Sequence, residues 1–299
     1  TTTRYGMLDT VHAYAWDRLT DVGEADTFAA RHLAWYRDLT ERAWPDFIGP
    51  VEMVWLTRLE RELDNVRAAL AWSQTQGHDA DAALDLASGL TFLWIAKGYV
   101  AEGQAHLDAM LARTDANRAP TIWSRALWSA SLLAYHRGDL ATARSLGDEA
   151  LAIRRALHSP KDMIQSLKDL GITARAQHDL AGARAFLEEA VALSQATGDE
   201  ANLAVSLDRL GTVTHAAGAW AEAAELYARG HALWRRLGDD ANSAWSLLNQ
   251  GRLALDRGDL AEARTLLRAG LALRRQDGHR PGLICLLDAF ATLAWRADH

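Results

Sequence analysis

The chain repeats itself with a step of 40 residues, and this repeat constrains the fold more than any other feature of the sequence. The clearest copies read GDLATAR, HDLAGAR, GAWAEAA and GDLAEAR, and they begin at Gly138, His178, Gly218 and Gly258. A weaker copy, GYVAEG, begins at Gly98. Three further columns keep the same 40-residue step. The core leucine column is Leu127, Leu167, Leu207, Leu247 and Leu287, and the small-residue column is Ser131, Gly171, Gly211, Gly251 and Ala291. The alanine column is Ala143, Ala183, Ala223 and Ala263.

Each 40-residue unit predicts two antiparallel α-helices. In the unit after Pro160, apolar side chains recur at spacings of three and four, which places Ile164, Leu167 and Leu170 on one helical face. A glycine such as Gly138 can adopt the left-handed conformation that ends a helix. The aspartate that follows such a glycine can accept the free N–H groups of the next helix. These signals place a turn in the middle of each unit.

The expected fold is all-α, a right-handed α-α superhelix behind a helical N-terminal cap. We assign residues 1–78 to this helical N-terminal region and residues 79–299 to the repeats, the last of which is truncated. A glycine inside a helix costs up to about 1 kcal/mol relative to alanine. Its recurrence therefore suggests a steric demand, and we expect the column of Gly171 to face the column of Ala183, where small side chains let two helices approach closely.

Composition excludes several classes of function. The net charge is −7, which argues against a general electrostatic grip on nucleic acid. The lone cysteine, Cys285, excludes an internal disulfide and a multi-thiolate metal site, and it fits a reducing, cytoplasmic compartment. No apolar stretch approaches the roughly 18–20 residues that cross a membrane. No histidine pair has the spacing typical of a metal site, so the sequence predicts no cofactor and no metal.

Within a unit, the pattern Leu207-x-x-Leu210-Gly211, followed by Ala223 and Tyr227, resembles the tetratricopeptide repeat. The resemblance is strong in the units that begin near Met163, Asn202 and Asn242. The period departs from the tetratricopeptide value of about 34 residues. A longer period resembles the superhelix in the sensor regions of bacterial ATP-dependent transcription regulators of the maltose-activator type.

The N-terminal 75 residues carry a second resemblance. Residues 4–15, RYGMLDTVHAYA, residues 31–36, RHLAWY, and residues 55–72, WLTRLERELDNVRAALAW, are similar to segments of bacterial signalling ATPases and transcriptional regulators. In that family this region follows a nucleotide-binding module and a winged-helix-like segment. No G-x-x-x-x-G-K-[ST] phosphate loop occurs here. The resemblance therefore implies the C-terminal arm of a larger regulator, with its own upstream ATPase module as a partner and without direct nucleic-acid or membrane contact.

The concave groove is the candidate site. In tetratricopeptide superhelices the first helix of each unit lines the concave side, so residues one, five and eight positions after the core leucine are expected to project into it. These columns vary in charge and size, as a surface that reads a protein, peptide or small-molecule effector requires. The candidates are Trp128, Lys168, Asp208, Ile172, Arg252, Tyr135, Arg175, His215 and, from its groove-side position, Trp245.

Simpler interpretations stay open beside this one. A solvated face without a ligand is also varied, and the solenoid could serve instead as a scaffold for oligomerisation of the parent protein. No catalytic constellation supports an enzyme. The arginine pairs that begin at Arg154, Arg235 and Arg274 lie near helix C-termini, where positive charge complements the helix dipole. Cys285, in an apolar run, and Trp220, in the leucine slot of a turn, are both expected to pack in the core.

Overall fold

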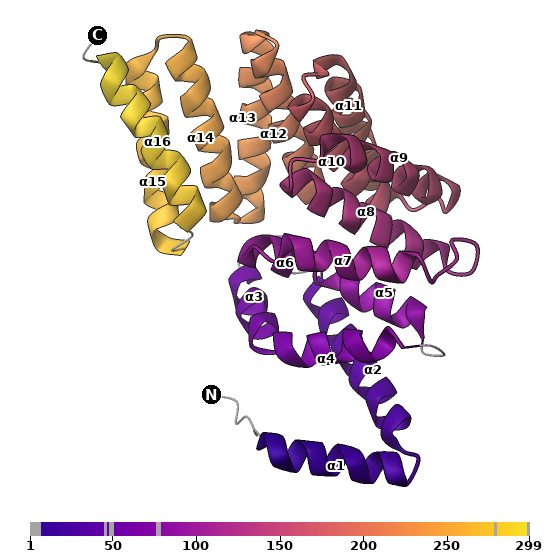
Figure 1. Ribbon diagram of the computed structural model, residues 1–299. Helices are drawn as coiled ribbons and strands as arrows, with labels where there is room; N and C mark the ends of the chain where they lie inside the picture. Colours follow the sequence, from indigo (N-terminus) through magenta and orange to yellow (C-terminus); the bar gives the residue numbers. More distant parts are fainter. Residues whose placement is uncertain (1–6, 45–46, 48–50, 76–78, 278–279, 298–299) are drawn as a thin grey trace.

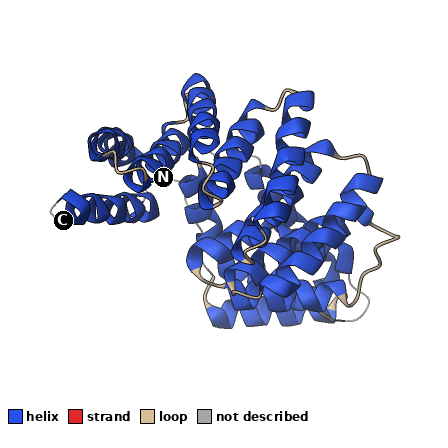
Figure 2. Cartoon of the chain, turned by 90° about the horizontal axis from the view of Figure 1, so that it is seen from above, coloured by secondary structure: helices blue, strands red, loops and turns tan. Residues whose placement is uncertain are grey.

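The computed structural model describes residues 7–44, 47, 51–75, 79–277 and 280–297, and this part of the chain forms helices without a strand (Figure 2). The all-α solenoid expected from the repeat is confirmed. The N-terminal part contains α1 (Asp9–Asp21), α2 (Ala25–Ala43), α3 (Glu52–Arg61), α4 (Leu63–Ser73), α5 (Ala80–Gly89), α6 (Thr91–Lys97) and α7 (Val100–Leu111). The regular part contains α8 (Pro120–His136), α9 (Leu140–Ala156), α10 (Pro160–Ala176), α11 (Leu180–Thr197), α12 (Glu200–Ala216), α13 (Trp220–Leu237), α14 (Asp240–Asp256), α15 (Leu260–Asp277) and α16 (Arg280–Ala297).

The helices follow one another along a curved path from α1 to α16 (Figure 1). Helix α1 lies apart at one end and adjoins α2, whereas α2 to α7 pack into a compact group. Most leucines of this group, among them Leu39, Leu59 and Leu86, are buried in one core cluster that extends to α8. The N-terminal helices and the first repeats therefore form one continuous core.

The first unit of the repeat has an interrupted first helix. Helix α5 ends at Gly89 and α6 begins at Thr91, so two short helices replace one long one. A β-carbon at Gly89 would lie 2.6 Å from the Cβ and Oγ1 of Thr40 on α2. The close approach of α2 to α5 explains the glycine, because any larger side chain would separate the two helices.

The turns inside the regular units use the chemistry that the sequence predicted. Gly138, Gly218 and Gly258 have φ between 79° and 81°, and His178 adopts the same left-handed conformation with φ of 63°. The Oδ1 of Asp139 accepts a hydrogen bond from the backbone N–H of the third residue after it at 3.1 Å, and equivalent caps open α11, α12, α14 and α15. Each of these helices therefore begins on a satisfied N–H group.

The small-residue column faces a large side chain of its partner helix, one turn beyond the alanine column. A β-carbon at Gly171 would lie 2.6 Å from the Cγ of Leu187, and Gly211 and Gly251 meet the side chains at positions 227 and 267 in the same way. The unit of α8 and α9 reverses the sizes: Ser131 stands in the glycine column and Gly147 stands opposite. The Ser131 hydroxyl donates to the carbonyl of Ala143 at 2.6 Å, and a β-carbon at Gly147 would lie 3.1 Å from the Ser131 oxygen.

Two of the packing predictions, those for Leu287 and Trp220, were wrong. The leucine column is buried in the first four copies, but Leu287 is 59% exposed, because no second helix follows α16 in the described part of the chain to cover it. Trp220 is 42% exposed, because it opens α13 at the end of a helix pair. Cys285 is half-buried against the last core cluster, as expected of a packing residue.

Candidate functional site

The first helices of three successive units line a groove with adjoining cavities. A cavity of 450 Å³ lies between α6, α8, α10 and α12, and one of 220 Å³ lies between α2, α6, α10 and α12. Both are lined by Phe92, Gln165 and Lys168. A third cavity of 130 Å³ continues past Arg175 along α10 and α12. We call this continuous hollow the Lys168 groove.

Aromatic rings from the N-terminal region form one wall of the groove. Trp44 and Phe47 follow α2 and Phe92 lies on α6; the rings of Trp44 and Phe92 contact Trp128 of α8. The ring centroids of Trp44 and Trp128 are 5.6 Å apart, and those of Phe47 and Phe92 are 5.2 Å apart. Aromatic pairs at these distances add attraction beyond the area that they bury. The wall therefore fixes the position of the N-terminal helices against the repeats.

A second wall carries a polar network centred on Asp169 of α10. The indole N–H of Trp128 donates to Asp169 Oδ2 at 2.8 Å, and the guanidinium of Arg209 donates to Asp169 Oδ1 at 2.8 Å. His136 also lines the 450 Å³ cavity; burial lowers the pKa of this histidine, and the Asp169 carboxylate opposes that shift. The network joins α8, α10 and α12, so three consecutive units share its bonds.

Lys168 lies at the junction of the two larger cavities. Its side chain is buried, and its Nζ donates to the Oδ1 of Asn202 on α12. Burial, together with the positive charge of Arg209, lowers the pKa of the Lys168 amine to about 8. An ammonium group in this position is a strong hydrogen-bond donor in a cavity with little water to compete.

Two of the arginines at helix C-termini are buried. Arg154 is 2% exposed and lies over the Trp128 ring, 5.6 Å from its centroid, while Arg274 is 3% exposed and lies over the Trp245 ring at 5.2 Å. Burial lowers the pKa of Arg154 to about 10. Both side chains lie in the last turn of their helices, where the helix-dipole interpretation places them, and each also packs against a tryptophan ring.

Asp208 stands one unit after Lys168 but has a different environment. Its carboxylate accepts hydrogen bonds from the Trp234 indole N–H at 2.9 Å and from the Ser246 hydroxyl at 2.9 Å. Burial raises the pKa of Asp208 to about 7, against the effect of both hydrogen bonds. The side chain is thus enclosed between α12, α13 and α14, and it does not line the Lys168 groove.

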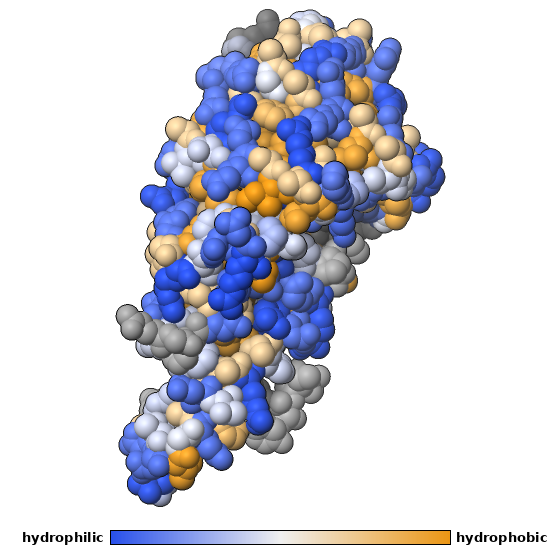
Figure 3. Space-filling view, turned by 90° about the vertical axis from the view of Figure 1, so that its right-hand side faces the viewer, coloured by the Kyte–Doolittle hydropathy of each residue, from blue (hydrophilic) through white to orange (hydrophobic). Residues whose placement is uncertain are grey.

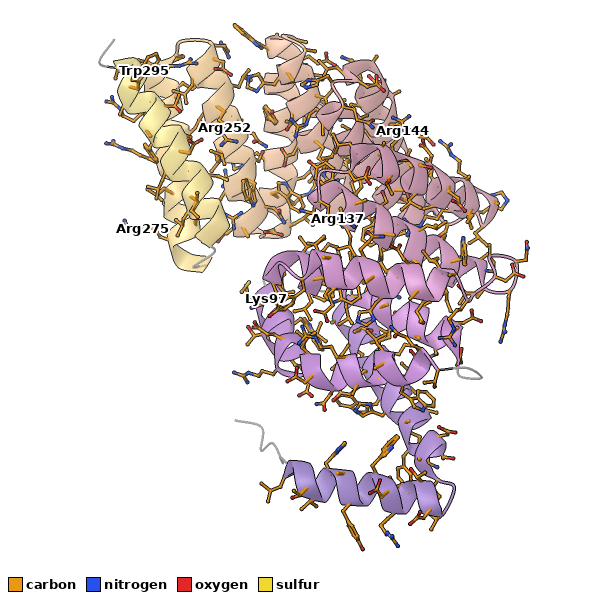
Figure 4. All side chains as sticks on the ribbon, viewed as in Figure 1. Lys97, Arg137, Arg144, Arg252, Arg275 and Trp295 are labelled. Atoms are coloured by element: carbon orange, nitrogen blue, oxygen red, sulfur yellow. The ribbon has the colours of Figure 1, made fainter. Side chains whose placement is uncertain are left out.

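Five of the predicted site residues come together. They all line the 450 Å³ cavity and are Trp128, Tyr135, Lys168, Ile172 and Arg175. The other candidates lie elsewhere: His215 Nε2 is 3.0 Å from Asp256, Arg252 reaches Asp288 at 3.5 Å, and Trp245 packs in the C-terminal core. Figure 4 shows Arg252 on α14 and Trp295 near the end of α16, both toward the C-terminal end of the solenoid.

Sequence reasoning missed part of the groove. Asp169 and Arg209 belong to a repeat column, with Ser129 and Asn249, that varies as much as the columns that were chosen. The same criterion of variation would have found them. Phe92 lies in the interrupted unit, where the 40-residue alignment is weakest, and no sequence signal points to it.

The described residues offer neither a metal-binding group of side chains nor a helix suited to span a membrane. No group of three or more histidine, cysteine or acidic side chains there could hold a metal ion. None of the described helices is long and apolar enough to cross a membrane. Hydrophobic side chains form separate patches among charged ones on the face seen in Figure 3.

The tetratricopeptide repeat family model matches residues 124–196 and 200–276, about half of the chain. The chain therefore belongs to the tetratricopeptide repeat family. Proteins named as HTH-type transcriptional regulators of Mycobacterium tuberculosis and Mycobacterium bovis are 34% identical over 170 residues, which is 51% of this chain and 19% of each regulator. This chain thus covers about a fifth of the length of those relatives.

Solved structures share the fold at low sequence identity. The NprR protein in complex with its cognate peptide NprX has a TM-score of 0.64 and 17% identity over 94% of this chain and 78% of that one. A Rap protein complexed with competence and sporulation factor has a TM-score of 0.63 and 10% identity, covering 90% and 88%. The signal transduction ATPase PH0952 of Pyrococcus horikoshii, which has a tetratricopeptide repeat sensor, has a TM-score of 0.64 and 12% identity, covering 96% and 43%.

Proposed function

We propose that the chain is the non-catalytic effector-binding arm of a larger bacterial transcriptional regulator or signalling ATPase, and that it acts in the cytoplasm. The observation that carries the proposal is the Lys168 groove, a set of adjoining cavities with a buried ammonium and an aromatic wall. The similarity to HTH-type regulators and to the repeat sensor of a signalling ATPase supports this role. The effector is a peptide, a protein segment or a small molecule.

The groove offers a physical route from binding to regulation. Trp44 and Phe47 follow the N-terminal helix α2, whereas Phe92, Lys168 and Asn202 belong to the repeats. A ligand between these two sets contacts both at once and favours one arrangement of the N-terminal helices against the repeats. A ligand shifts such an equilibrium only by its difference in affinity for the two arrangements. The upstream ATPase module of the parent protein would receive that shift.

Blocking the groove tests the proposal. Ile172→Trp places a large ring in the 450 Å³ cavity, and Leu157→Trp places the same ring at a 38% exposed position after α9 as the matched control. Each purified protein is equilibrated with a low-molecular-weight extract of the producing bacterium and examined by native mass spectrometry. We expect a bound compound on the wild type and on Leu157→Trp, and none on Ile172→Trp. Equal loading of both variants would refute the groove as the sensor.

A second candidate function rests on the surface of α1 and α2. Leu8 is 75% exposed, Tyr14 is 64% exposed and Trp16 is 40% exposed, and a 720 Å³ cavity lies between α1, α2 and α4. Apolar exposure of this size is typical of an interaction surface, so a scaffold that assembles the parent protein is the alternative. Light scattering tests it: a dimer that Tyr14→Glu dissociates supports the scaffold, and a monomer at every concentration contradicts it.

A further inference from the structure

The Lys168 ammonium has unused hydrogen-bonding capacity. Its side chain is 3% exposed and lines both larger cavities, yet its one hydrogen bond within the described chain goes to the neutral amide of Asn202 at 2.5 Å. No described carboxylate lies within 4.0 Å of its Nζ. An ammonium group carries three donors. Two of them are free to meet a group inside the cavity.

The nearest acidic side chains are committed to other partners. Asp169 accepts from Trp128 and Arg209, at 2.8 Å each. Asp199 caps α12, where it accepts from the backbone N–H of Asn202 at 3.0 Å and from its side-chain amide at 2.8 Å. Each acid therefore gives its hydrogen-bonding capacity to groups other than Lys168. A buried charge without an opposite charge is costly, and a protein keeps it where it serves a purpose.

Arg175 adds a second positive charge to the same cavity. It lines the 450 Å³ cavity and makes no ion pair with any residue of the described part. The cavity therefore has an excess of positive charge in a chain whose net charge is −7. The sequence contains only three lysines against 29 arginines, and one of the three is the buried Lys168. The local sign of charge favours an anion as the ligand.

Apolar side chains form another part of the cavity wall. Phe92, Ile95, Leu132 and Ile172 line it beside the Trp128 ring. A volume of 450 Å³ is within the range of cavities that hold small organic molecules. A ligand that satisfies both walls has a compact apolar or aromatic body and one anionic head.

On the basis of the function proposed above, we propose that the Lys168 groove binds a small organic carboxylate, with the carboxylate on the Lys168 ammonium and an apolar body against Phe92 and Trp128. A free aromatic acid and the C-terminal residue of a short peptide present this same chemistry. The depressed pKa of the Lys168 amine agrees with the proposal, because a bound carboxylate would restore the charged form.

Matched acids and amides test the charge requirement. The probes are 3-phenylpropionate and 3-phenylpropanamide for a free acid, and N-acetyl-Ala-Phe with a free or an amidated C-terminus for a peptide. Binding is measured by calorimetry up to about 10 mM probe, which detects millimolar affinities. We expect at least one acid to bind at least tenfold more tightly than its amide near pH 6.5, and this advantage to fall at least fivefold near pH 9.5, where the amine loses its proton. The acid–amide pair that shows this difference tells whether the ligand is a free acid or the C-terminus of a peptide.

Lysine NMR provides a readout on the wild type. With three lysines, a chain labelled at lysine Cε gives three resolvable signals, assigned by single Lys→Met variants. We expect the acid to shift the Lys168 signal and to raise the pKa of this amine, while the amide leaves both unchanged. Lys168→Met should remove the preference for acid over amide, and Lys97→Met, at a lysine paired with Glu60 on the outside of the groove, should keep it. Circular dichroism verifies that both variants fold.

The outcomes separate this inference from the function on which it rests. Acids and amides that bind equally, with binding blocked by Ile172→Trp, would overturn the carboxylate proposal and leave the groove as a ligand site. An absence of any effect of the acids on the Lys168 signal would also overturn it. The extract experiment with Ile172→Trp judges the sensor function independently, because it does not depend on the charge of the ligand.

Discussion

Asp208 is a buried carboxyl group whose ionisation makes the stability of the fold depend on pH. Its carboxylate accepts from Trp234 and Ser246 and has no cation within ion-pair distance in the described chain. The folded state therefore holds the proton more tightly than the unfolded state, with a pKa of about 7 against 3.8. The contribution of Asp208 to stability is therefore greatest below pH 3.8 and is lost as the pH rises through 7, the opposite of an ion-paired aspartate.

The size of the effect follows from the two pKa values. Each pH unit between them is worth about 1.4 kcal/mol. Between pH 5 and pH 8 the wild type should therefore lose about 2–3 kcal/mol relative to Asp208→Asn, whose side chain does not titrate. The asparagine keeps one acceptor oxygen but loses one of the two hydrogen bonds, at a cost of about 1 kcal/mol. The variant should be near the wild type in stability at pH 5 and more stable at pH 8.

Urea denaturation followed by circular dichroism at both pH values measures this difference. Because solenoids can unfold in parts, the slope of each transition must agree between the two proteins before midpoints are compared. Asp240→Asn, at an exposed position in the first turn of α14, is the control. A difference between wild type and Asp208→Asn that stays constant within about 0.5 kcal/mol from pH 5 to pH 8 would refute the reasoning.

Three further predictions follow from packing and charge. Gly211→Ala should cost about 1–3 kcal/mol in urea denaturation, because its β-carbon would lie 2.6 Å from the Tyr227 ring; an unchanged midpoint would contradict this. Lys168→Met should raise the free energy of unfolding at pH 7 by about 1–3 kcal/mol, because burial holds the pKa of the amine at about 8 and the charged form costs energy below that pH. This gain should vanish above pH 10.5, and a variant that is less stable than the wild type at pH 7 would contradict the prediction. Arg184→Ala should change the free energy of unfolding by less than about 1 kcal/mol despite its two bonds to Glu222, because the pair is about 40% exposed; a larger loss that salt does not reduce would argue otherwise.

The fold could be predicted from the sequence because its signals are local and repeated. The left-handed glycines and the aspartate caps act within a few residues, and each signal recurs four or five times at the 40-residue step. The interrupted unit was harder to predict from the sequence, because the break between α5 and α6 depends on the approach of Thr40 from α2. A contact between distant segments leaves no periodic trace.

The site could be predicted only in part, because neighbouring side chains decide what each column position does. Lys168 and Asp208 occupy the same position of the repeat, 40 residues apart. The second helix supplies Trp234 to cover Asp208, whereas the equivalent residue for Lys168 is Ser194, whose hydroxyl donates to Ala190 in its own helix. A short side chain at that position leaves Lys168 to bond across to Asn202 and to line a cavity.

The exchange of sizes between Ser131 and Gly147 defines which piece of the chain can be moved as a block. Both residues belong to the unit of α8 and α9, so the exchange of sizes between them lies within a single helix pair. A graft or duplication cut at the connections around Ser159 and Asp199 keeps Gly171 and Gly211 with the side chains for which they make room, whereas Gly147 also makes room for Leu170 of the next pair. A cut inside a pair, at Gly138 or His178, would instead join Ser131 to a leucine or leave two glycines facing a void. This solenoid should therefore be lengthened or shortened by whole helix pairs such as α8–α9.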